Sequence, residues 1–134
     1  MSTRLPDITE EIAHRAESDP DIVVLWLYGS RARGDHSEAS DYDFAVAFQS
    51  FPDDPLERQT RPEQQAITRA AELDMADDQI SVVDINLAPI PLAGEILATG
   101  KVLVCKNDMR LYHEESRISG MIELDWDYHR ARYG

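Results

Sequence analysis

The sequence predicts an α/β fold of the α+β type, with a central sheet of about four strands flanked by helices and a long helix at the C-terminus. Apolar segments rich in β-branched and aromatic residues, as buried strands require, lie at residues 22–28, 41–48, 80–87 and 101–105. Between these segments, apolar residues recur at helical spacing. The 134 residues suffice for a single domain with a substantial core, covering residues 1–134, but not for a separate substrate-binding domain.

The first two elements follow directly from the hydrophobic pattern. Residues 7–18 carry apolar side chains at helical spacing with Asp7 as the N-cap, which predicts a helix packed on the sheet. Residues 22–28 form a nearly continuous apolar run, which suits a strand buried on both faces. We therefore expect this strand near the middle of the sheet.

The later elements are less regular in sequence. Residues 49–62 are polar and contain several prolines, which predicts a loop. The remaining predicted elements, in chain order, are a helix at 63–74, a strand at 80–87, a helix at 89–99 closed by Gly100, a strand at 101–105 and a long helix at about 107–131.

A Gly-Ser pair ends the first strand. Gly29 lets the backbone turn sharply and approach a ligand closely, and Ser30 can open a short helix whose amide groups point at an anion. Arg31 and Arg33 add positive charge beside this turn. These four residues are the candidate nucleotide-binding residues. The alternative is a plain turn with a helix cap, with both arginines exposed to solvent.

Two aspartates open the next strand. Asp41 and Asp43 lie two residues apart and so project from the same face. Adjacent carboxylates repel each other unless a cation neutralises them, and Mg²⁺ prefers such oxygen ligands. Two metal ions ~3.5–4 Å apart would need a third carboxylate, which Asp84 in a later apolar strand could supply. The alternative is that all three acids are solvated residues of exposed strands.

The whole arrangement resembles the minimal nucleotidyltransferase family of the polymerase-β superfamily. That family has Gly-Ser, ten residues, Asp-x-Asp and a later aspartate, and this chain has Gly29–Ser30, ten residues, Asp41–Asp43 and Asp84. The resemblance covers about residues 8–106. It implies a polymerase-β-like fold with a mixed sheet, two Mg²⁺ ions held by the three aspartates, which are then the catalytic residues, and ATP phosphates on the Gly-Ser turn.

The resemblance also implies a function. Small stand-alone members of the family are antitoxins, commonly encoded beside a HEPN-type ribonuclease toxin, and they transfer AMP from ATP to a toxin tyrosine. We therefore expect a Mg-dependent protein adenylyltransferase in a hetero-oligomer with its toxin. Two alternatives stay open: an antitoxin that neutralises its partner by binding alone, and an adenylyltransferase acting on a small molecule such as an antibiotic. The lack of an acceptor domain counts against the last.

Composition narrows the choice of partner. A formal net charge of −13 opposes association with nucleic acid, because contacts to phosphate need Lys and Arg, and instead suits a basic protein surface. No segment has the ~18 apolar residues of a membrane span, and the N-terminus lacks the apolar region of a signal peptide. We expect a cytoplasmic protein. The single cysteine, Cys105, is expected to be a small buried apolar residue.

The C-terminal helix allows two interpretations. Its apolar residues recur near helical spacing, which is typical of a helix packed on the sheet. The alternative is a face that binds a partner, with Trp126, Tyr128 and Tyr133 as anchors, since aromatic residues dominate binding hot spots.

Overall fold

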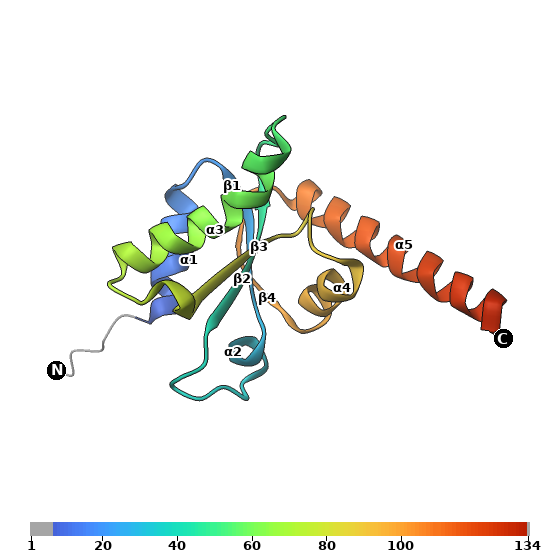
Figure 1. Ribbon diagram of the computed structural model, residues 1–134, viewed down its shortest axis with the longest axis horizontal. Coiled ribbons are helices and arrows are strands. Elements are labelled where there is room, and N and C mark those ends of the chain that lie inside the picture. Colours follow the sequence, from blue (N-terminus) through green and yellow to red (C-terminus); the bar gives the residue numbers. More distant parts are fainter. Residues whose placement is uncertain (1–6, 134) are drawn as a thin grey trace.

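The structure, a computed structural model, describes residues 7–133, with the side chains of the last helix described as far as Leu124 and again at Trp126. A four-stranded sheet lies at the centre, with helices on both sides (Figure 1). Its strands are β1 (Ile22–Tyr28), β2 (Tyr42–Phe48), β3 (Ile80–Asp84) and β4 (Lys101–Cys105), in the order β3-β2-β1-β4.

The sheet is mixed, as predicted. β1 pairs antiparallel with both β2 and β4, whereas β2 and β3 are parallel. The parallel pair needs a crossover, which the helix α3 (Pro55–Glu72) provides. Consequently the end of β1 and the start of β2 meet at one end of the sheet, together with the short helix α2 (Ser30–Arg33).

Both faces of the sheet are covered, which explains the continuous apolar sequence of β1, whose seven residues are all buried. The helices α1 (Ile8–Ser18) and α3 cover one face, here called the α1/α3 face, over the bulky side chains of β2 such as Phe44 and Phe48. The helices α4 (Ile90–Thr99) and α5 (Asp108–Tyr133) cover the other, the α4/α5 face. There the buried apolar residues of β2 are the alanines Ala45 and Ala47, so these helices can approach closely.

Two predicted boundaries were wrong. The loop expected at 49–62 ends at Asp54, whose side chain accepts a hydrogen bond from the amide of Leu56 and caps α3. Pro55 then occupies the first turn, where its missing N–H costs nothing. The helix continues through Pro62, which is buried, so the apolar contact offsets the hydrogen bond that proline cannot donate.

The third strand is also shorter than expected. It ends at Asp84, whose side chain accepts from the amide of Asn86 and whose carbonyl accepts from the amides of Leu87 and Ala88. These bonds form a tight turn into α4. Leu87 is therefore exposed rather than part of the core.

The last helix is anchored by a buried acid. Glu114 is 2% exposed, and its carboxylate accepts from Asn86 Nδ2 at 2.9 Å, from Arg110 and from Arg117. Arg110 also donates to the carbonyl of Phe48 at 2.9 Å. This network ties the first half of α5 to the ends of β2 and β3, while its C-terminal end projects away from the sheet (Figure 1).

Within residues 7–133, no helix combines the length and the apolar character that crossing a bilayer demands.

Candidate functional site

The Gly-Ser turn and the second aspartate of the Asp-x-Asp motif are in direct contact. Gly29 has φ +73° and ψ −159°, a conformation open essentially to glycine alone. A Cβ built on Gly29 would overlap the carboxylate of Asp43. The backbone thus passes against this carboxylate at the point where α2 begins. The predicted helix opening at Ser30 is confirmed.

The two aspartates lie together at this end of the sheet. Asp43 is in β2, half-buried and paired with Tyr28 of β1, while Asp41 lies just before the strand and is exposed. Burial raises the pKa of Asp43, the charge of Asp41 raises it further, and the guanidinium of Arg33 lowers it. A bound cation would stabilise the ionised form of a carboxylate whose pKa is raised in this way.

Asp84 does not join them. In the parallel pair, Asp84 is opposite Val46, whereas Asp43 is opposite Ser81. Paired residues share a face of the sheet, so Asp84 lies on the α1/α3 face with Val46, and Asp43 lies on the α4/α5 face. The expected three-carboxylate cluster is therefore not assembled in this structure.

The surroundings of Asp84 explain an acid in an apolar strand. It is buried, it accepts from the amide of Asn86, and its Oδ2 lies 3.8 Å from Arg61 Nη2. Burial raises the pKa of Asp84, and the Asn86 amide and the charges of Arg61 and Arg110 oppose that rise. The guanidinium of Arg61 also stacks on the ring of Phe48, 3.8 Å from its centroid. These contacts give Asp84 a structural role at the end of the sheet.

Arg31 holds the loop that leads to the Asp-x-Asp motif. Its Nε and Nη2 both donate to the carbonyl of Ser40, at 3.1 and 2.9 Å, and Nη2 also reaches the carbonyls of Ser37 and Glu38. Its guanidinium stacks 3.8 Å from the ring centroid of Tyr42. These contacts make Arg31 a clamp on the loop that leads to the Asp-x-Asp motif.

Arg33 points toward the acids of the site. It pairs with Asp35 at 3.3 Å and with Glu95 of α4 at 3.2 Å, and its charge acts on Asp43. Both of its ion pairs are largely exposed and therefore weak, so an incoming phosphate can compete for the guanidinium. Sequence reasoning missed Glu95, although it is the only charged residue of the apolar helix α4.

A family model described as Polymerase beta, Nucleotidyltransferase matches residues 10–109. The chain belongs to this family. None of the curated proteins matches the sequence.

Solved toxin–antitoxin structures share the nucleotidyltransferase fold over nearly the whole chain. A toxin–antitoxin crystal structure with AMP-PNP matches with a TM-score of 0.69 at 21% identity, covering 95% of this chain and 94% of that one. A MntA-HepT toxin–antitoxin structure gives 0.66 at 18% identity and 92% of both chains. A tri-AMPylated HEPN toxin of Shewanella oneidensis in complex with MNT antitoxin gives 0.64 at 18% identity, covering 92% and 93%.

The donors at this nucleotidyltransferase site suit a hard divalent cation. Asp41 and Asp43 offer carboxylate oxygens side by side, and Asp43 carries a raised pKa that a cation would relieve. Across the described part of the chain, no three Asp, Glu, His or Cys side chains come together to hold a metal. The residues therefore fit Mg²⁺ bound through two carboxylates and completed by water and substrate phosphates.

Two hydroxyl groups lie beside Asp43 that sequence reasoning missed. Tyr28 of β1 and Ser81 of β3 both pair with Asp43, one on each side of it in the sheet. Burial and the charges of Asp43 and Glu95 raise the pKa of Tyr28 to about 12, so its hydroxyl stays protonated. The sequence gives no motif for either residue; only the strand register brings them to the site.

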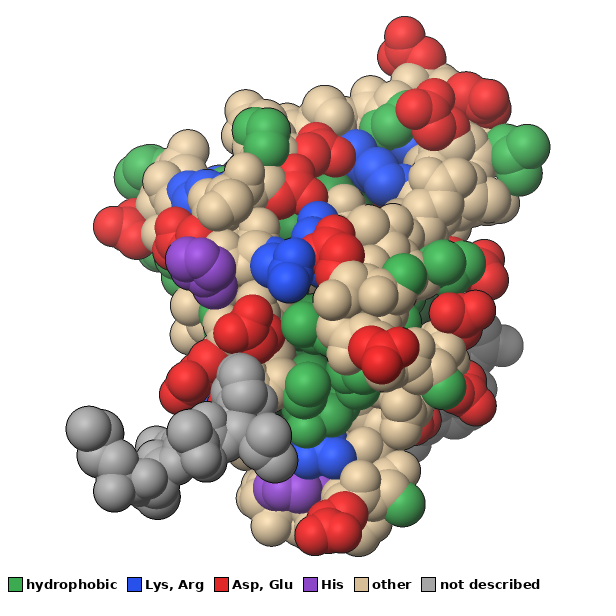
Figure 2. Space-filling view, turned by 90° about the vertical axis from the view of Figure 1, so that its left-hand side faces the viewer, with side chains coloured by type: hydrophobic (Ala, Val, Ile, Leu, Met, Phe, Trp, Pro, Cys, Tyr) green, Lys and Arg blue, Asp and Glu red, His purple; other side chains and the backbone are tan. Residues whose placement is uncertain are grey.

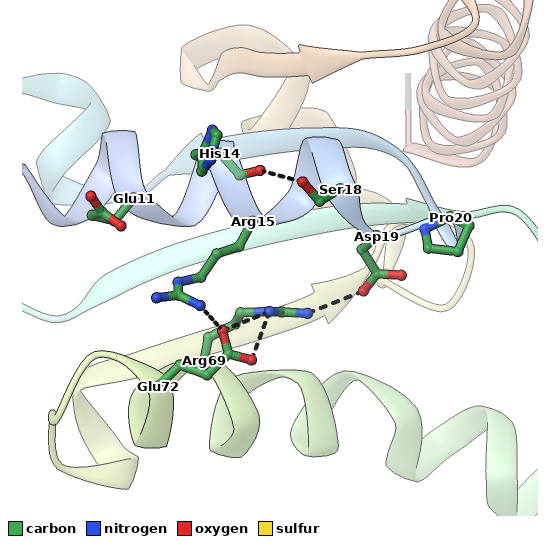
Figure 3. Close-up of a pocket in the computed structure, with 8 residues that line it drawn as sticks. All are labelled: Glu11, His14, Arg15, Ser18, Asp19, Pro20, Arg69 and Glu72. Atoms are coloured by element: carbon green, nitrogen blue, oxygen red, sulfur yellow. Dashed lines mark hydrogen bonds and ion pairs between the residues drawn. The ribbon is translucent and has the colours of Figure 1, made fainter.

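A polar pocket lies away from this site, on the α1/α3 face. A cavity of about 590 Å³ between α1 and α3 is lined by ion-paired side chains (Figure 3). Arg69 pairs with Asp19 at 3.1 Å and with Glu72 at 2.9 Å, and Arg15 reaches Glu72 from the facing helix. On this side of the molecule, acidic side chains lie among Lys and Arg side chains (Figure 2). These pairs join the two helices that cover the sheet.

Proposed function

We propose that the protein is an antitoxin that transfers AMP from ATP to a tyrosine of a HEPN-type ribonuclease toxin and thereby neutralises it. The observation that carries the proposal is the contact between the Gly29 turn and the carboxylate of Asp43. This contact supports the proposal because the turn proposed to bind phosphate and the acids proposed to bind metal then lie within one substrate's length of each other. The structural likeness to a complex that contains a tri-AMPylated HEPN toxin supports AMP transfer to such a partner.

The residues would divide the work as follows. Asp41 and Asp43 would hold Mg²⁺, which when bound would supply positive charge beside the triphosphate. The Ser30 hydroxyl and the first amides of α2, which have no acceptor within the helix, hold the β- and γ-phosphates. Arg33 is close enough to exchange its exposed pair with Glu95 for a phosphate oxygen.

The chemical step is an in-line displacement. The tyrosine hydroxyl oxygen forms a bond to the α-phosphorus, and the bond from that phosphorus to the oxygen bridging to the β-phosphate breaks. Pyrophosphate leaves with the bonding electrons, and the phenolic proton passes to solvent. Asp84 has no part in this step, because it lies on the other face of the sheet.

The charge of the chain supports a protein acceptor. With a formal net charge of −13, the molecule repels nucleic acid and attracts a basic protein surface. A hetero-oligomer with the toxin would also bring the acceptor tyrosine to the site.

Neutralisation by binding alone is a second candidate, favoured by the exposed apolar side chains in the C-terminal half of α5. Met121, Ile122, Leu124 and Trp126 are all exposed, Leu124 to 68% and Trp126 to 65%, and a group of exposed apolar side chains is typical of an interaction surface. The side chains of Tyr128 and Tyr133, the other two expected anchors, lie outside the described residues.

Intact-mass measurement of the partner separates the two candidates. Incubation of the toxin with the protein, Mg²⁺ and ATP should add about 329 Da per transferred AMP, the mass of one AMP residue. Asp41→Asn combined with Asp43→Asn should abolish the shift, while Asp84→Asn should keep it. An unchanged toxin mass with full inhibition of its ribonuclease activity would contradict AMP transfer and favour binding.

A further inference from the structure

One position beside Asp43, where a third metal-binding carboxylate would have to lie, holds an uncharged residue. The strand register identifies this position. The position of β3 directly beside Asp43 on the α4/α5 face is Ser81. The neighbouring pairs confirm the alternation: Val82 packs with the core of the α1/α3 face, and Val83 with that of the α4/α5 face. A third carboxylate that shares a metal with Asp43 would therefore have to replace Ser81.

Asp84 cannot move into the position beside Asp43 that Ser81 occupies. It lies three residues beyond Ser81, or about 10 Å along the strand, and its side chain is on the opposite face. The amide of Asn86 donates to its Oδ1 at 2.9 Å, which fixes the carboxylate in the turn after β3. A slip of the strand by one residue would turn every apolar side chain of β3 to the wrong face.

The other nearby acids do not occupy the position beside Asp43 either. Glu95 of α4 acts on Asp43 through its charge, but its carboxylate pairs with Arg33 at 3.2 Å. Asp77 and Asp78 precede β3 and line an open groove of about 480 Å³ at its edge. Among the residues that the structure describes, these acids and the two motif aspartates form no group of three ligands.

We propose that the site holds a single divalent cation between Asp41 and Asp43, and that the hydroxyls of Ser81 and Tyr28 occupy the place where a second cation would otherwise bind. The inference rests on the proposed function and replaces the pair of ions expected from the sequence. It deepens the proposed function because it bears on the acceptor.

A single cation has a consequence for the substrate. A second cation would stabilise the attacking oxygen, which here must ionise without that help. A phenol, with a pKa of about 10, ionises far more easily than an aliphatic alcohol. The arrangement therefore selects phenolic acceptors, such as a tyrosine side chain, over serine or sugar hydroxyls.

Mn²⁺ binding measures the number of ions directly. The full chain is titrated with Mn²⁺ in the presence of a non-hydrolysable ATP analogue, and bound ions are counted by equilibrium dialysis and electron paramagnetic resonance. The wild type should bind about one ion per chain, with the resolved lines of isolated Mn²⁺. Ser81→Asp should bind about two, broadened by magnetic coupling at a separation of ~3.5–4 Å.

Matched variants make the result specific. Ser81→Asn, which has the same size as the aspartate but no charge, and Asp84→Asn should both keep one ion per chain. Two ions in the wild type, or an ion lost in Asp84→Asn, would overturn the inference, and so would a well-folded Ser81→Asp that binds only one. If Ser81→Asp does not fold, the wild-type count and the Asp84→Asn count still decide.

AMP transfer measured on the same samples separates this inference from the proposed function. Two bound ions with normal transfer to the toxin would refute the single-cation site alone. One bound ion without transfer to the toxin or to any phenol would refute the proposed function and leave the ion count standing. No bound ion would refute both.

Discussion

Replacing Gly29 with alanine is expected to slow AMP transfer roughly 100-fold while most molecules stay folded. Its conformation costs a non-glycine residue about 1–3 kcal/mol, which is less than the 5–15 kcal/mol by which a typical domain is stable. The new Cβ would also overlap the carboxylate of Asp43 and push it aside. A displacement of ~1 Å at a catalytic group costs roughly 100-fold in rate.

The assay compares the rate of AMP transfer with the melting temperature of each variant. Gly34→Ala is the matched control, because Gly34 also has a positive φ, +83°, but a Cβ there meets nothing within 4 Å. It should lose about 1–2 kcal/mol of stability and keep transfer within a few-fold of the wild type. Near-normal transfer by Gly29→Ala would refute the idea that the turn positions Asp43.

Three further results are expected. Arg31→Ala should weaken Mn²⁺ binding, measured by calorimetry, because the clamp on the loop is lost. Arg31→Lys should not restore the affinity for Mn²⁺, since lysine cannot donate to three carbonyls while stacked on a ring. Unchanged affinity would contradict the clamp. Glu114→Gln should lower the free energy of unfolding by about 3 kcal/mol, and the exposed Glu115→Gln by almost nothing; equal losses in urea denaturation would contradict a buried anchor. Burial alone would raise the pKa of Glu114, but bonds from Asn86 and Arg117 outweigh it and hold the pKa below its usual 4.5. The stability that ionised Glu114 contributes is therefore present above pH 4.5 and is lost as the pH falls through the lower pKa of the folded state. In Glu114→Gln, the free energy of unfolding should therefore fall less steeply as the pH decreases below 4.5.

Local patterns predicted the parts of the fold that depend on local physics. The buried run of β1, the turn at Gly29 and the Asp43 face of β2 follow from composition and alternation, and the structure has them. The start of α3 was missed because prolines near residue 55 indicate a loop. The pair Asp54–Pro55, a cap followed by proline in the first turn, was the signal that could have placed it.

The third acid shows where sequence reasoning stops. Alternation within β3 correctly separates Asp84 from Val83, but it does not say which of the two faces meets Asp43. That depends on the register between β2 and β3, which the crossover through α3 and the packing of both faces determine. Ser81 has no signal of its own in the sequence, since a serine in a strand is unremarkable until the pairing is known.

A crystal structure with Mn²⁺ and a non-hydrolysable ATP analogue tests the account most directly. Anomalous scattering should place the cation between Asp41 and Asp43, with the analogue's phosphates on the turn at Gly29–Ser30 and no metal at Asp84. A cation bound by Asp84, or phosphates away from the turn, would contradict the site described above.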